Sequence, residues 1–160
     1  MKKMLLLAML GLGFAAQSQT DYCTQAKTLY SEGKYDQAMK AVNRDLVKSP
    51  DHTECRKIRI NSALKASPSG GSLVTAMSDL NYLLTHGDKS ETTYKQMGDA
   101  SSSLAKLQFD DRDYASAVKQ YTIAKEAYQK AKSVSGKSEY DRLIADTDSR
   151  IKDATSETKP

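Results

Sequence analysis

The stretch DYASAVKQYTIAKEAYQKAK, residues 113–132, carries the most regular spacing in the chain. Tyr114, Tyr121 and Tyr128 recur every seven residues, and an alanine follows each tyrosine after three further positions. Spacings of three, four and seven place side chains on one face of an α-helix. The stretch therefore predicts a long helix with a tyrosine–alanine stripe, which is either a recognition surface or the packed face of the helix.

The chain after residue 18 continues this helical spacing. Apolar residues recur every three or four positions, and we find no alternating apolar–polar run flanked by hairpin turns. Turn residues such as Gly33 and Pro50, and the run SPSGG, divide the sequence into segments. We predict an all-α fold of about seven helices, at about 20–32, 35–48, 52–66, 72–86, 90–109, 112–133 and 138–154. The polar residues 155–160 are predicted to form a disordered tail.

Residues 1–18 have the layout of a secretory signal peptide. Two lysines precede an apolar run from Met4 to Ala16, and small residues at Ala16 and Ser18 suit a cleavage site. The run is too short to span a bilayer comfortably, and no later segment is apolar enough to do so. We expect export through the general secretory route and no transmembrane segment in the mature chain. The alternative is an uncleaved N-terminal anchor.

The charge of the chain argues against a nucleic-acid partner. The 160 residues include 24 Lys and Arg and 20 Asp and Glu, for a net charge of +4. Two of the lysines lie in the leader, so 22 basic side chains remain against 20 acidic ones, and the two signs are interspersed. A nucleic-acid surface requires a clustered basic face, so none is expected.

Two segments share a motif. GKYDQAMKAV (33–42) and RDYASAVKQY (112–121) each contain a tyrosine, an alanine three positions later and a large residue four positions after the alanine. The motif resembles the second helix of a tetratricopeptide repeat, in which the small residue lies where the second helix crosses the first. The resemblance implies units at about 19–52, 53–90 and 91–134, with 138–154 as a capping helix. It implies crossing residues at Ala38, Ala76 and Ala117.

The same alignment with the repeat motif, here called the frame, extends to the first helices of the units. Tyr22 matches the family's first aromatic position in the first unit, and Tyr94 and Gly98 match the pattern in the third. The chain departs from the motif at Asp45, where the family has a small residue, and the second unit lacks the signature tyrosine. Each helix pair leaves apolar surface that only a neighbouring pair covers, so about three units are needed for stability. The alternative is an unrelated antiparallel helical array.

Cys23 and Cys55 are the two cysteines, and their separation of 32 residues is close to one repeat. The frame places them on equivalent helices of neighbouring units, where an exported protein could form a disulfide. Their registers differ by two positions, which could leave the Cα atoms too far apart. Two alternatives to the disulfide therefore remain: two buried thiols, or a zinc site formed by the two cysteines and His52. Zinc is the poorest of these because His52 and His86 are the only histidines and no Cys-x-x-Cys motif is present, so no metal site is predicted.

No pattern in the sequence indicates catalysis. We find neither a Gly-x-Ser-x-Gly motif nor a glycine loop that would cradle a phosphate. Both histidines fall in predicted loops, and Asp110 and Asp111 precede a helix as capping residues do. We expect a protein that is not an enzyme and has no cofactor.

Binding is expected instead on the first helices of the units, whose outward residues line the groove of the tetratricopeptide family. The residues that the resemblance implies are Lys27, Tyr30, Lys57, Asn61, Lys65, Lys95 and Asp99. The family's clamp for a terminal carboxylate is incomplete because Thr92 and Gln96 occupy its positions in the third unit. A merely solvated lysine face is an equal alternative for these positions.

The sequence thus favours a non-catalytic adaptor that binds a protein or peptide in the envelope of a diderm bacterium. The protein would be periplasmic or outer-membrane-associated, and a monomer or weak oligomer. One alternative is a structural subunit of an envelope or secretion assembly. Another is a carrier of a small glycan or lipid, which no residues support.

The tyrosine stripe can be assigned within the same frame. Tyr114 and Tyr121, with the alanines at 117 and 124, fall on the inner face of the third unit's second helix. Tyr128 and Ala131 extend the stripe toward the capping helix. A tyrosine there buries its ring while its hydroxyl reaches a polar edge, so packing is predicted and Tyr30 is the better candidate for a groove tyrosine.

Overall fold

A computed structural model describes residues 21–67 and 69–158 of the chain. The helices in these ranges, in chain order, are α1 (Tyr22–Ser31), α2 (Tyr35–Lys48), α3 (Thr53–Lys65), α4 (Gly70–Thr85), α5 (Glu91–Asp110), α6 (Tyr114–Ser135) and α7 (Glu139–Glu157). The predicted all-α fold is confirmed, and every predicted boundary except the end of α7 lies within two residues of the observed one. The predicted signal peptide, residues 1–18, lies outside the described residues and stays a prediction.

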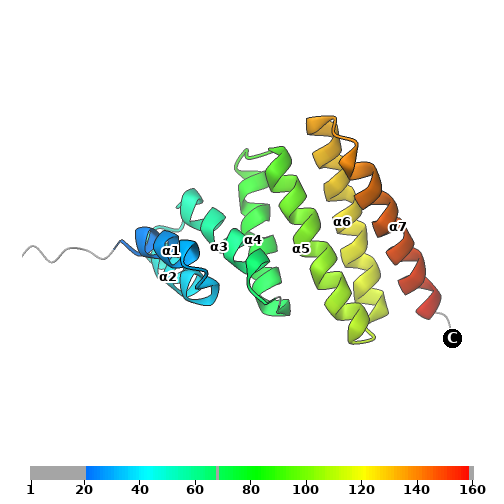
Figure 1. The fold of residues 1–160 in the computed structure, drawn as a ribbon, viewed down its shortest axis with the longest axis horizontal. Helices are drawn as coiled ribbons and strands as arrows, with labels where there is room; N and C mark the ends of the chain where they lie inside the picture. The colour runs from blue at the N-terminus through cyan, green and yellow to red at the C-terminus, as the bar shows by residue number, and fades with distance from the viewer. Residues whose placement is uncertain (1–20, 68, 159–160) are drawn as a thin grey trace, which may run out of the picture.

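The helices stack into an elongated array, with α1 and α2 at one end and α7 at the other (Figure 1). Each helix contacts the next along the chain, and α3 also contacts both α1 and α5. The first helices of the predicted pairs therefore form one layer, against which α2, α4 and α6 pack. Within the described part of the chain, no helix has both the length and the apolar character needed to cross a membrane.

The helix of the quoted stretch has clear start and stop signals. The Asp113 side chain accepts a hydrogen bond from the Ser116 backbone N–H at 3.2 Å and so caps the start of α6. Gly136, with φ +69°, ends α6 in the left-handed conformation that glycine adopts without strain. This turn directs the chain back into α7, which packs on α6.

Small residues lie where the helices approach. Ala38, Ala76 and Ala117 have no exposed surface, and Ala117 shares a buried cluster with Ala105 of α5 and Ala154 of α7. Alanine permits a close helix–helix approach that a larger side chain would prevent. The burial of all three alanines fits the predicted crossings.

The tyrosine stripe packs inside the array. Tyr121 and Tyr128 are only 3% and 4% exposed, while the half-buried Tyr114 contacts Phe109 edge to face, with ring centroids 5.1 Å apart. A Cβ added at Gly98 on α5 would lie 2.6 Å from Cδ1 of Tyr128, closer than real Cβ contacts. Gly98 is therefore the residue that lets α5 approach the Tyr128 ring, and the prediction of a packed stripe is confirmed for Tyr121 and Tyr128.

A buried ion pair joins α3 to α4. The Asp79 carboxylate is fully buried and accepts hydrogen bonds from Arg56 Nη1 at 2.6 Å and from Arg59 Nε and Nη2 at 2.7 Å. The Arg56 guanidinium also lies 3.9 Å from the centroid of the Tyr82 ring. Two guanidinium groups thus neutralise one carboxylate inside the second helix pair.

The prediction of a disordered tail from residue 155 is wrong for Thr155–Glu157, because α7 continues to Glu157. Ile151 and Ala154 pack in the cluster with α5 and α6 and hold the last turns of α7 in place. The Thr155 hydroxyl also donates to the Ile151 carbonyl at 2.6 Å. Polar composition alone did not indicate these anchoring contacts.

Candidate binding groove

One cavity of about 550 Å³ runs along the layer of first helices. Its walls come from the end of α1, from α3, from α5 and from the start of α7. The lining residues are Tyr30, Asn61, Leu64, Lys65, Glu91, Thr92, Lys95, Gln96, Asp99, Ser103, Lys137, Glu139 and Tyr140. Residues more than a hundred positions apart in the sequence therefore face the same space.

Five of the seven predicted groove residues line this cavity: Tyr30, Asn61, Lys65, Lys95 and Asp99. Lys57 lines a neighbouring cavity of about 380 Å³ that also includes Asn61. There Lys57 pairs with Asp88 at 3.5 Å. Lys27 is exposed on α1 and lies outside both cavities. The binding role of all seven residues stays a prediction.

Polar side chains of α5 form the floor of the groove. Gln96 Nε2 donates to Asn61 Oδ1 at 2.6 Å and links α5 to α3. Lys95 Nζ donates to Asp99 Oδ2 at 2.8 Å, and the Tyr128 hydroxyl donates to Asp99 Oδ1 at 3.0 Å. Burial, together with the Asp99 charge, raises the pKa of Tyr128. Asp99 thus accepts one hydrogen bond from Lys95 within the groove and another from Tyr128 on the packed face of α6.

Glu91 connects α5 to the start of α7. Its Oε1 accepts hydrogen bonds from Lys137 Nζ and from the Tyr140 hydroxyl, both at 2.7 Å. The hydrogen bond from Lys137 has the largest effect and that from Tyr140 the next, and together they lower the pKa of Glu91 below its ordinary value. Tyr140 has no exposed surface, and its burial raises the pKa of its hydroxyl. The cap end of the groove is therefore closed by a defined set of contacts.

The contribution of α7 to the groove was missed in the sequence. Tyr140 was not predicted because residues 138–154 were interpreted only as a cap, and Glu91 and Lys137 were not among the groove positions that the repeat motif implies. The structure shows that α7 begins on the same side as α1, α3 and α5. A tyrosine near its start, like Tyr22 in α1 and Tyr94 in α5, is the signal that could have extended the groove to this helix.

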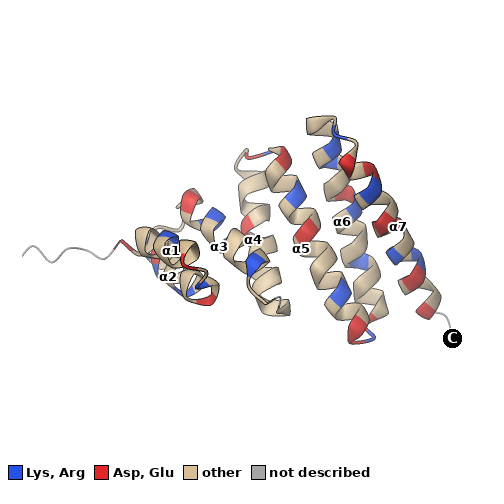
Figure 2. Ribbon diagram, in the orientation of Figure 1, with Lys and Arg blue, Asp and Glu red and all other residues tan. Residues whose placement is uncertain are grey.

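Charges of both signs are interspersed over the array (Figure 2). Within the groove, Lys95 pairs with Asp99 and Lys137 pairs with Glu91. Lys65 differs, since no carboxylate of the described residues lies within ion-pairing distance of its exposed ammonium group. It is the groove lysine whose charge is available to a partner.

The two cysteines meet at the far end of the array. Cys23, at the start of α1, and Cys55, in the first turn of α3, are joined as a disulfide with their Cα atoms 5.4 Å apart. That distance lies within the range that a disulfide permits, so the register difference of two positions does not separate them. Asp45 of α2 and His52 lie beside the pair, with one ligand atom from each of the four residues within 4.8 Å of the others. The sequence suggested His52 as a possible zinc ligand beside the cysteines, but it did not predict that Asp45 lies next to them.

No family model matches the sequence, and a search of curated proteins found no match. The fold is similar to the NMR structure of the first TPR domain of the human RPAP3 protein, with a TM-score of 0.59 and 15% identity. The alignment covers 84% of this chain and 93% of that domain. This likeness shows a tetratricopeptide-like fold, as the sequence resemblance predicted, and at this identity it shows the fold alone.

Proposed function

We propose that this chain is a non-catalytic adaptor that holds a protein or peptide segment in the groove formed by α1, α3, α5 and the start of α7. One observation carries the proposal: α1, α3, α5 and the start of α7 all contribute side chains to a single cavity. Repeat folds present extended binding surfaces of this kind. A tetratricopeptide-like fold is typical of proteins that bind other proteins.

The chemistry of the groove suits an extended polypeptide. Because Asn61 Oδ1 accepts from Gln96, its amide N–H groups are left to donate to a partner's carbonyl groups. The unpaired Lys65 ammonium offers a site for a carboxylate. Tyr30 and Leu64 add apolar surface beside it. We therefore expect a segment with an acidic or C-terminal carboxylate near Lys65 and an apolar side chain near Tyr30.

We also propose that the protein works in the bacterial cell envelope after export. The leader pattern of residues 1–18 supports this location, and a disulfide between Cys23 and Cys55 suits an oxidising compartment. Intact-mass measurement of the protein from its native cells tests the proposal. Cleavage after Ser18 gives a mature chain that begins at residue 19, whereas an uncleaved leader would contradict a released mature chain and favour the N-terminal anchor.

The alternative is a structural subunit that assembles through the opposite layer. The exposed large apolar side chains of the described residues lie on α2, α4 and α6: Val47, Val74, Ile123 and Val134. Single exposed apolar residues are normal on a monomer, so they favour the groove rather than an assembly face. Sedimentation of the purified protein separates the two functions, because an adaptor remains a monomer and an assembly subunit self-associates.

Site-specific photo-crosslinking in native cells tests the groove directly. A photoreactive residue at Thr92 faces the cavity, and one at the exposed Thr122 on α6 lies on the other layer. We expect a captured partner from Thr92 and none from Thr122. Capture from Thr122 alone, or equal capture from both positions, would place the interaction elsewhere.

A charge reversal gives an independent check on purified components. Lys65→Glu is expected to weaken binding of the captured partner, whereas the matched change Lys130→Glu on the exposed surface of α6 leaves it unchanged. Both variants should keep the stability of the unaltered chain, since neither lysine is buried. Equal binding by the two variants would argue against the groove.

A further inference from the structure

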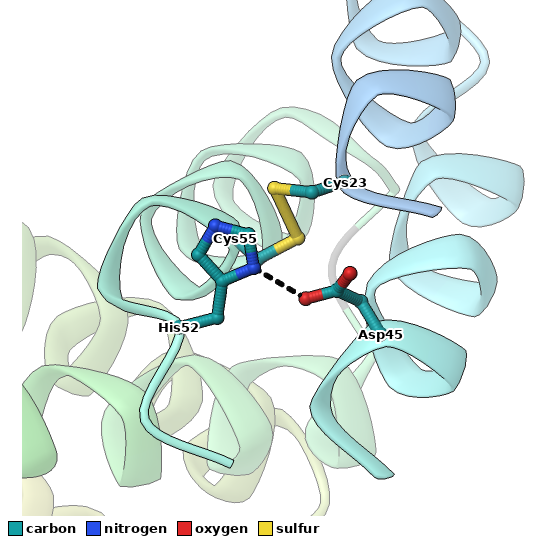
Figure 3. A group of neighbouring side chains, drawn as sticks. All are labelled: Cys23, Asp45, His52 and Cys55. Atoms are coloured by element: carbon teal, nitrogen blue, oxygen red, sulfur yellow. Dashed lines mark hydrogen bonds and ion pairs between the residues drawn. A yellow bond between two sulfur atoms is a disulfide. The ribbon is translucent and has the colours of Figure 1, made fainter. Parts of the chain in front are cut away.

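Side chains from three separate segments converge beside the first helix pair (Figure 3). Cys23 comes from α1, Asp45 from α2, and His52 and Cys55 from the start of α3. One ligand atom of each lies within 4.8 Å of the other three. The cysteines are buried, and the other two side chains are half-buried. None of the four side chains lines the groove.

These donors form a set that tetrahedral zinc sites use. Zinc binds Cys sulfur at about 2.3 Å and His nitrogen or carboxylate oxygen at about 2.0–2.2 Å. In a tetrahedron such lengths place neighbouring ligand atoms roughly 3.3–3.8 Å apart. The four ligand atoms lie within 4.8 Å of one another, so side-chain movements on the order of 1–1.5 Å would bring them to these separations once the S–S bond is broken. We propose that the reduced chain binds one Zn²⁺ through Cys23, Asp45, His52 and Cys55.

The helix geometry favours thiolates at this place. Cys23 and Cys55 both lie in the first turns of their helices, where the helix dipole stabilises negative charge. The Cys23 backbone N–H also donates to the capping Asp21 carboxylate at 3.0 Å, which fixes the start of α1. Both sulfur atoms are thus presented from rigid helix ends, and thiolate is the form that binds metal.

Asp45 and His52 are already arranged as a pair. His52 Nδ1 lies 2.6 Å from Asp45 Oδ2, and the contact joins the end of α2 to the start of α3. The repeat motif has a small residue at the position of Asp45, so this carboxylate is a departure from the motif. To bind one Zn²⁺ together, Asp45 Oδ2 and the His52 nitrogen would lie about 0.7 Å further apart than the 2.6 Å of this contact.

The disulfide and the zinc site are alternative states of the same cysteines. A dithiol reductant delivers two electrons and two protons, the S–S bond breaks, two thiols form, and the reductant becomes a disulfide. Zn²⁺ then displaces the two thiol protons and forms two Zn–S bonds. The disulfide joins α1 to α3, whereas the metal also includes α2 through Asp45.

Cobalt titration tests the site without any assay of partner binding. The protein is reduced anaerobically with a dithiol, the reductant is removed, and Co²⁺ is added. We expect one equivalent to bind with the intense visible absorption of a tetrahedral thiolate site, and one equivalent of Zn²⁺ to abolish that absorption. The oxidised protein should show neither change. A reduced protein without the tetrahedral spectrum would overturn the proposal.

Variants identify the two ligands that are not sulfur. Loss of an outer-sphere partner lowers metal affinity about 10–100-fold, so loss of a direct ligand in His52→Ala should lower Zn²⁺ affinity by at least about 100-fold. Asp45→Asn preserves side-chain shape and should lower it at least about 10-fold. The matched control His86→Ala alters the histidine that stacks on Tyr82 and should leave the affinity unchanged.

Two readouts separate a lost ligand from a lost fold. Helical circular dichroism of each reduced variant reports folding, and X-ray absorption of the unaltered reduced protein counts two sulfur and two nitrogen or oxygen neighbours around zinc. Unchanged affinity in both folded variants, or a shell of sulfur with water only, would contradict the assignment of His52 and Asp45.

Discussion

Replacing Asp79 with alanine tests the ion pair inside the second helix pair. The Asp79 carboxylate has no exposed surface and accepts three hydrogen bonds from guanidinium groups of α3. Asp79→Ala removes every one of these acceptors. It leaves Arg56 and Arg59 charged, and both side chains then face an apolar methyl group at the contact between α3 and α4.

The expected loss of stability can be estimated from burial. Removing one partner of a buried ion pair costs about 3–5 kcal/mol, because the remaining charge is left uncompensated. The Arg56 and Arg59 side chains keep 15% and 14% exposure, so they can turn partly toward water. We therefore expect Asp79→Ala to lower the free energy of unfolding by about 3 kcal/mol, the lower end of this range. In a domain of roughly 150 residues this lowers the thermal midpoint by about 10 °C.

Urea unfolding followed by circular dichroism measures this change. The free energy of unfolding is compared for the unaltered chain, Asp79→Ala and the control Asp146→Ala, whose carboxylate is exposed on α7. The control should differ by less than about 0.5 kcal/mol. Joint replacement of Asp79 by leucine and of both arginines by methionine should recover much of the loss, since no buried charge is then left unpaired. A loss below about 1 kcal/mol in Asp79→Ala would refute the reasoning.

Three further changes test the packing and the electrostatics of α5 and α6. Gly98→Ala places a methyl group against the Tyr128 ring, and we expect a net loss of about 1–2 kcal/mol in urea unfolding after the gain in helix propensity; an increase in stability would contradict the close approach. Ala117→Leu overpacks the α5–α6 crossing and should cost about 1–3 kcal/mol, so an unchanged urea midpoint would reject that crossing. The pKa of Glu91 is lowered by its bonds from Lys137 and Tyr140, so its stabilisation is present above the unfolded value of 4.5 and is lost as pH falls through the folded value. The thermal midpoint of Glu91→Gln should therefore lie below that of the unaltered chain at about pH 7, and the difference should shrink as the pH is lowered below 4.5, whereas a constant difference would exclude a role for the charge.

The layer of first helices could be predicted because its signals are local. Periodicity located the helices, and the alanine predicted at each crossing is buried. Outward positions on the first helices then led to Tyr30, Asn61 and Lys65 in the groove. Gly98 matched the motif in the sequence, and the structure gives its reason, since the ring of Tyr128 occupies the space that a side chain would fill.

Features that depend on the relative placement of distant segments could not be predicted in this way. The Glu91–Tyr140 contact spans 49 residues, and it depends on the lengths of α5 and α6 and on the direction in which α7 returns. The cluster around Cys55 requires the ends of three helices to meet. A buried carboxylate such as Asp79 has no distinguishing pattern, since in sequence it is one more polar residue on a helix.

The state of the cysteines should affect one end of the groove and leave the other unchanged. Tyr30 ends the groove on α1, and the disulfide joins α1 to α3. Lys137 and Tyr140 end it at α7, where Glu91 holds them. In an exported, oxidised protein, replacing Cys23 and Cys55 together by serine frees α1 to move relative to α3.

We therefore expect a photoreactive residue at Tyr30 to capture less partner in the double-serine chain, while one at Lys137 captures as much as before. Urea unfolding of the double-serine chain reports the accompanying loss of about 2–4 kcal/mol and shows that the array remains folded in buffer. Equal losses of capture at both positions would mean that the cysteines stabilise the whole array and do not position α1 alone.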